Sequence, residues 1–155
     1  MLRLLNLPLL AALLCFALGS ASAFAELPLL VLSNEQLTRP VEVPASLVLE
    51  DPSGNLTAAE VQQRIDREGT RMDGVPRLGY SASAWWLAFR LDAPVAERLD
   101  LMIDRPFLDD IEVWLYDRER LIAPFYSGDH RDFLLRGAPS PHFLLNLPRL
   151  GEGPH

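Results

Sequence analysis

The sequence predicts a mainly β fold, an antiparallel β-sandwich with one short helix. Apolar and polar residues alternate with a period of two over most of the chain beyond residue 80, as they do in strands that bury one face. Thirteen prolines and nine glycines interrupt helical patterns and mark turns. In a chain of 155 residues, two packed sheets are the simplest way to bury strands of this kind.

The first 25 residues have the layout of a secretory signal peptide. Arg3 supplies the positive start, an apolar stretch covers residues 4–18, and small residues follow it. We expect cleavage after Ala25, with cleavage after Ala23 as the alternative, and a periplasmic domain over residues 26–155. A retained membrane anchor is the other interpretation, but an apolar stretch of about 15 residues is shorter than the roughly 20 that span a bilayer.

Composition excludes several classes of function for the exported domain. Cys15 is the only cysteine and lies in the leader, so residues 26–155 have no disulfide, no thiolate metal site and no cysteine nucleophile. Fourteen basic against 21 acidic residues give a net charge of −7, which disfavours nucleic-acid binding. Because no cofactor motif and no zinc spacing of histidines occurs, we expect neither a cofactor nor a metal.

The first part of the exported domain predicts two strands, a turn and the helix. Short apolar runs predict strands at 29–32 and 45–50. Residues 51–55, Asp-Pro-Ser-Gly-Asn, are typical of a tight turn. Thr57 and Glu60 then form a capping box, in which each side chain accepts an amide hydrogen bond from the other residue. The helix that they begin is expected to end at the next glycine.

The second part of the exported domain predicts five strands from its alternation. The ranges are 85–92, 99–104, 111–116, 121–126 and 143–147. Turn residues such as proline, glycine and aspartate separate them. We therefore expect an antiparallel sheet with one face on the core.

Three of these strands carry large apolar residues on the face that otherwise holds charges. The residues are Trp86, Met102, Trp114 and Tyr116, and Arg90 shares their side. If the three strands are neighbours in one sheet, these side chains form an aromatic patch that can stack on sugar rings or apolar ligands. The alternative is that the helix or the N-terminal segment covers this face, since a one-residue error in strand parity exchanges the two faces.

Polar loops supply the other candidate site residues. The three aspartates of loop 104–110 have the oxygen ligands for a hard cation or a catalytic pair, although their spacing matches no calcium loop. His130, between two aspartates, has the chemistry of a base. The ligand-binding candidates are Trp86, Arg90, Trp114, Tyr116, Arg105, Asp109, Asp129 and Arg136.

Six segments in order along the chain resemble one family, the 7TMR-DISM extracellular domain of type 2. They are Leu49–Thr57, Leu78–Ser81, Ala84–Leu91, Ile103–Val113, Ser127–Arg136 and Pro141–Leu145. Each segment alone is weakly diagnostic, but together they extend over most of the exported domain. Ala88 departs from the pattern, because the family often has arginine there.

This resemblance implies a jelly-roll sandwich like that of carbohydrate-binding modules. It implies a periplasmic sensor that recognises a carbohydrate or another small molecule. In the family, seven transmembrane helices and an output module, such as a histidine kinase or a diguanylate cyclase, follow the domain. The resemblance also implies a final strand beyond residues 151–155, so we expect the sandwich to lack its last strand and to meet the membrane only through a missing 7TM region.

The leading hypothesis is a non-enzymatic, ligand-binding sensor module of a signalling receptor. The second is a protein-interaction domain that docks a partner receptor or a second copy of itself. The third, an exported hydrolase, would use Asp109 or Asp110 with His130, and no activating arrangement of residues supports it.

Overall fold

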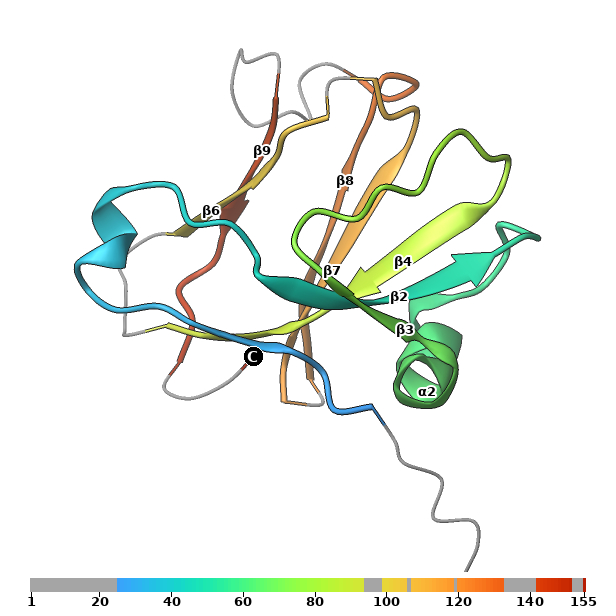
Figure 1. Ribbon diagram of the computed structural model, residues 1–155. Helices are drawn as coiled ribbons and strands as arrows, with labels where there is room; N and C mark the ends of the chain where they lie inside the picture. The colour runs from blue at the N-terminus through green and yellow to red at the C-terminus, as the bar shows by residue number, and fades with distance from the viewer. Residues whose placement is uncertain (1–24, 94–98, 106, 119, 133–141, 152–154) are drawn as a thin grey trace, which may run out of the picture.

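In the computed structural model, the described residues are mainly strands, with the α-helix α2 beside them (Figure 1). It describes residues 25–93, 99–105, 107–118, 120–132, 142–151 and 155; the predicted leader therefore lies outside the described residues, except for Ala25. The elements are β1 (Leu29–Val31), the 3-10 helix η1 (Gln36–Thr38), β2 (Ala45–Asp51), α2 (Ala58–Glu68), β3 (Thr70–Asp73), β4 (Ala84–Ala88), β5 (Arg90–Asp92), β6 (Leu99–Ile103), β7 (Ile111–Asp117), β8 (Arg120–Ser127) and β9 (Phe143–Leu147).

The strands form several small sheets, which confirms the predicted β-sandwich with one short helix. Antiparallel pairing gives the order β3-β2-β4, the pair β6-β9 and the hairpin β7-β8. One pair departs from the antiparallel expectation, because β1 runs parallel to β5. A parallel pair needs a long connection, and here β2, α2, β3 and β4 all lie between its two strands.

The strand predicted over residues 85–92 is divided in two. The break falls at Phe89: β4 before it pairs with β2, whereas β5 after it pairs with β1. Alternation in the sequence detects an extended chain but not a change of partner. Only the placement of the neighbouring strands divides this segment.

Helix α2 begins and ends where the sequence predicts. The Thr57 hydroxyl accepts from the Glu60 amide at 3.3 Å, and the Glu60 carboxylate accepts from the Thr57 amide at 2.8 Å. The helix buries Val61 and Ile65 against the β2 residue Leu47 in one apolar cluster. Leu49, Trp86 and Ala88 complete that cluster on the strand side, so this helix covers one face of the β3-β2-β4 sheet.

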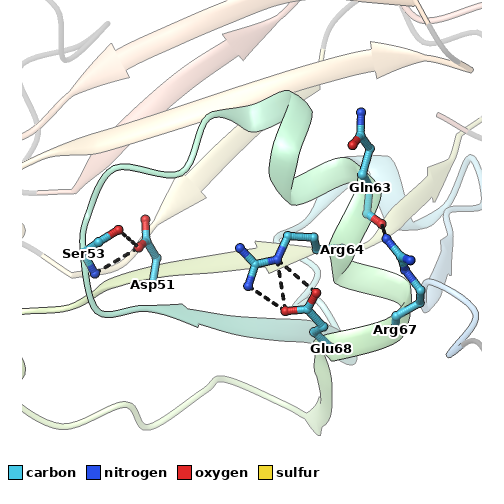
Figure 2. A network of polar contacts seen from close by, with 6 residues as sticks. All are labelled: Asp51, Ser53, Gln63, Arg64, Arg67 and Glu68. Carbon is cyan, nitrogen blue, oxygen red and sulfur yellow. Dashed lines mark hydrogen bonds and ion pairs between the residues drawn. The ribbon is translucent and has the colours of Figure 1, made fainter.

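The turn between β2 and α2 is organised by the buried carboxylate of Asp51. One of its oxygens accepts from the Ser53 amide, the Ser53 hydroxyl and the Gly54 amide, and the other accepts from the Leu56 amide at 2.8 Å. These hydrogen bonds, that from the Ser53 side chain first, lower the pKa of Asp51 against the opposing effect of burial. Figure 2 shows this carboxylate close to the exposed Arg64–Glu68 ion pair of α2.

Strand β3 was not predicted from the sequence. Its residues are mostly charged or exposed, and only Gly69 separates it from α2. A Cβ on that glycine would lie 2.3 Å from the Ile65 carbonyl oxygen. The chain can turn from α2 into β3 this closely because residue 69 has no side chain. The edge of β2 then supplies the pairing that makes the segment a strand.

The β6-β9 pair shows the predicted alternation on both of its faces. Phe143 and Leu145 are buried on one face. On the other, the Asn146 amide donates to Asp100 at 2.6 Å, and Met102 is 46% exposed. The predicted placement of Met102 beside acidic residues is therefore confirmed for this strand.

Candidate functional site

The hairpin of β7 and β8 brings two aromatic residues to one face. Trp114 is opposite Pro124 and Glu112 is opposite Tyr126, so all four share a side of the hairpin. The Trp114 and Tyr126 rings meet edge to face, with centroids 6.1 Å apart and planes at 85°. This is a favourable aromatic geometry, in which each ring packs against the other.

Arg131 covers the Tyr126 ring and joins it to two carboxylates. Its guanidinium carbon lies 5.1 Å from the centre of the ring. It donates through Nε and Nη2 to the two oxygens of Asp110, and Nη2 also donates to Glu112 at 3.3 Å. We call the set Trp114, Tyr126, Arg131, Asp110 and Glu112 the Trp114 surface.

The charges of the Trp114 surface stabilise each other. The hydrogen bonds from Arg131 hold the pKa of Asp110 below its ordinary value of 3.8, although burial acts in the opposite direction. The same contact raises the pKa of Arg131. Both groups therefore stay ionised near neutral pH, and one guanidinium faces two carboxylates.

Two loops meet beside this surface and fix the position of Arg131. The Asp129 amide donates to the Leu108 carbonyl at 2.8 Å, and the His130 amide donates to the Asp109 carbonyl at 3.0 Å. Gly128 is buried at the crossing with φ of +131°, and a Cβ on it would lie 2.3 Å from the Asp109 carbonyl oxygen. The two loops approach this closely because residue 128 is glycine.

The three strands expected to form one aromatic patch are not neighbours. β4 pairs with β2, β6 with β9 and β7 with β8, so the condition on which a single patch depended is not met. Trp86 packs against the cluster under α2. This is the alternative in which the helix covers that face. Arg90 is half-buried in β5 and forms an ion pair with Glu26 at 3.3 Å.

The other predicted site residues have different positions. Tyr116 is half-buried in β7, two residues beyond Trp114 and on the same side of the strand. Arg105, Asp109 and Asp129 are exposed in the loops, and Arg136 lies outside the described residues. Of the eight predicted ligand-binding residues, Trp114 is thus the member of the Trp114 surface.

Sequence reasoning missed Tyr126 and Arg131 as members of the site, and it considered Asp110 as a cation-binding or hydrolase residue but not as a ligand-binding one. Arg131 comes after the end of β8, where no strand periodicity applies to it. Tyr126 depends on the register of the hairpin, which is shifted by an irregularity between Leu115 and Tyr116. Residues 104–110 and 128–132 together hold five aspartates and two arginines, and this concentration of opposite charges was the signal available in the sequence.

The chemistry that this arrangement supports is recognition. The pair proposed for a hydrolase is loose, because His130 Nε2 lies 3.7 Å from Asp109 on an exposed loop, and Asp110 is held by Arg131. Among the described residues, no group of three or more histidine, cysteine or acidic side chains converges as a metal site would require. Aromatic rings beside ordered hydrogen-bonding groups are the usual elements of a small-molecule surface.

Comparison with known proteins gives one finding. A family model described as 7TMR-DISM extracellular 2 matches residues 44–155, which is more than half of the chain. No curated protein matches significantly. Within the described part of the chain, no helix is long and apolar enough to cross a membrane.

Proposed function

Because the chain belongs to the 7TMR-DISM extracellular 2 family, the extracellular sensory domains of receptors, we propose that it is the periplasmic ligand-binding module of a transmembrane signalling receptor. In this proposal the ligand is an uncharged, hydroxyl-rich small molecule such as a carbohydrate, and it docks on the Trp114 surface. The output is a change in the receptor to which the domain is attached.

The observation that carries the proposal is the packed aromatic pair of Trp114 and Tyr126. The Trp114 and Tyr126 rings pack edge to face, and the Arg131 guanidinium lies over the face of the Tyr126 ring. A rigid ring costs little conformational entropy when a ligand stacks on it, so such rings are efficient binding surfaces. Carboxylates beside the rings accept hydrogen bonds from hydroxyl groups.

The charges of the Trp114 surface favour one class of ligand over another. A ligand carboxylate or phosphate needs a free cationic partner, but Arg131 already donates to Asp110 and Glu112. A ligand anion that displaced Asp110 or Glu112 from Arg131 would leave that carboxylate without its hydrogen-bond donor. The proposal therefore favours uncharged polyols over anionic ligands.

The test is a thermal-shift screen of the exported chain against mono- and oligosaccharides, with amino acids as the charged comparison. A ligand at 100 times its Kd should add about 2.7 kcal/mol of stability. For a domain of this size that corresponds to a rise in Tm of about 5 °C or more. Trp114→Ala should remove the shift.

Tyr80→Ala is the matched control, because Tyr80 is a fully exposed aromatic residue outside the Trp114 surface. It should leave both the Tm and the ligand shift within error. Absence of a shift with every uncharged ligand, or equal loss of the shift in both variants, would contradict the proposed site. A shift with amino acids alone would contradict the ligand class.

A protein-interaction role is the second candidate. The exposure of Tyr80 and of Phe107, which is 87% exposed, favours it, since exposed aromatic residues are enriched in interfaces. Sedimentation velocity at several concentrations separates the two functions. Self-association without a small molecule, abolished by Phe107→Ser, would support this second role.

A further inference from the structure

The chain is packed against helix α2 already at Ala25. The Ala25 amide donates to the Asp66 carbonyl of that helix at 2.7 Å. The side chains of Ala25 and Leu27 pack against the apolar cluster between α2 and β2. Figure 1 shows this start of the coloured chain beside α2. Ala25 therefore contributes a hydrogen bond and apolar contacts to the fold.

The residues that follow Ala25 continue from α2 to β5. Glu26 forms an ion pair with Arg90 at 3.3 Å. Pro28 is buried, and its carbonyl accepts from the Arg90 amide at 2.7 Å. Strand β1 then pairs with β5 along its whole length. We call residues 25–31 the N-terminal strap, because they connect the helix to this strand.

The predicted leader offers two bonds for its removal. Alternating alanines at 21–23 precede the Ala23–Phe24 bond, and those at 23–25 precede the Ala25–Glu26 bond. The second bond lies inside the N-terminal strap. Proteases cleave backbone that is exposed and free of structural hydrogen bonds, and the strap engages the chain on both sides of the Ala25–Glu26 bond.

The two cleavages have different consequences for the fold. Hydrolysis after Ala25 removes this residue, and with it the hydrogen bond to Asp66 and the contacts on the apolar cluster. Hydrolysis after Ala23 keeps all of these interactions. The packing of the strap therefore favours the bond that the sequence alone ranks second.

We propose that the leader is removed at the Ala23–Phe24 bond, so that the mature chain begins at Phe24 and retains the complete N-terminal strap. In the active site of a leader peptidase, water adds across this peptide bond. The products are a carboxylate on Ala23 and an α-amino group on Phe24, which is largely protonated at neutral pH. This inference rests on the predicted leader and is independent of the ligand that the Trp114 surface binds.

The first test is the intact mass of the exported protein, expressed as the full chain and purified from the periplasm. The two candidate products differ by one phenylalanine and one alanine, and we expect the product that begins at Phe24. A product that begins at Glu26, or one that keeps the leader, would overturn the proposal.

Two substitutions form a matched pair for the same measurement. Ala21→Asp changes the motif before the Ala23–Phe24 bond alone, and Ala25→Leu changes the residue before the Ala25–Glu26 bond. Ala21→Asp should remove the product that begins at Phe24, whereas Ala25→Leu should leave it. The reverse pattern would assign cleavage to the second bond. Because mass identifies the terminus directly, the reading does not depend on how stable the Ala25→Leu protein is.

The second test measures what Ala25 contributes. Chains that begin at Phe24 and at Glu26 are compared by thermal unfolding. Loss of one backbone hydrogen bond and of the Ala25 contacts should lower the Tm of the shorter chain by about 3–5 °C. Equal Tm values would overturn the argument that the fold requires Ala25.

Discussion

Replacing Gly128 with alanine tests the crossing of the two loops that position Arg131. The new Cβ would lie 2.3 Å from the Asp109 carbonyl oxygen and 2.8 Å from the Asp110 Cα, whereas ordinary contacts begin near 3.4 Å. The loops must therefore separate by about 1 Å. That movement strains or breaks the hydrogen bonds of the Asp129 and His130 amides.

The expected cost combines two physical effects. An alanine at φ of +131° costs of order 1–3 kcal/mol in backbone strain. Each backbone hydrogen bond lost adds about 1 kcal/mol. We expect Gly128→Ala to lower the free energy of unfolding by about 2–5 kcal/mol, a large share of the 5–15 kcal/mol typical of a domain. Ligand-induced thermal shifts should fall with it, because Arg131 loses its position.

Gly79→Ala provides the matched control for this prediction. Gly79 also has a positive φ, of +70°, but a Cβ on it would meet nothing within 4 Å. Gly79→Ala should therefore lower the free energy of unfolding only by the backbone strain, about 1 kcal/mol. Urea denaturation followed by tryptophan fluorescence measures both variants. If Gly128→Ala were no less stable than Gly79→Ala, the argument from the close approach would be refuted.

Three further predictions concern stability. Thr57→Ala should cost about 1 kcal/mol, measured by urea denaturation, because the α2 cap loses its hydroxyl acceptor; an unchanged midpoint would contradict the capping role. Phe143→Ala should cost about 3–5 kcal/mol, since this side chain is fully buried, and a loss below 1 kcal/mol in calorimetry would place it outside the core. The folded-state pKa values of Asp51 and Asp110 are below the ordinary 3.8, so the stability these groups contribute is present above pH 3.8 and is lost as the pH falls through their folded-state values. Asp51→Asn should accordingly reduce the acid dependence of the Tm, and an identical acid profile would show that its hydrogen bonds do not favour the charged form.

The local elements of this fold were predictable because their causes lie close together in the sequence. The Thr57–Glu60 box lies within one helical turn, and it begins α2 where expected. Strand β9 has the predicted bounds and β6 ends one residue before the predicted range 99–104, since one apolar face alternates with one polar face along each. Such patterns need no knowledge of a partner.

Trp86 and Trp114 show what local sequence patterns do not predict. Trp86 and Trp114 have the same parity signature in the sequence, yet Trp86 packs under α2 and Trp114 lies beside Tyr126. The difference comes from the element that covers each strand. The helix α2 packs on the β3-β2-β4 sheet. Its position depends on tertiary packing, which the alternation of apolar and polar residues does not predict.

The sequence by itself determined the β class, the helix α2 with its cap, the family, and the presence of aromatic residues on the polar faces of strands. Only the tertiary structure decided which of them meet. Pairing continued regularly from Asp117 and Arg120 would put Phe125 opposite Glu112, but the irregularity at Leu115 puts Tyr126 there instead. Because strand side chains alternate with a period of two, that one-residue shift exchanges the faces of β8 and so creates the Trp114 surface.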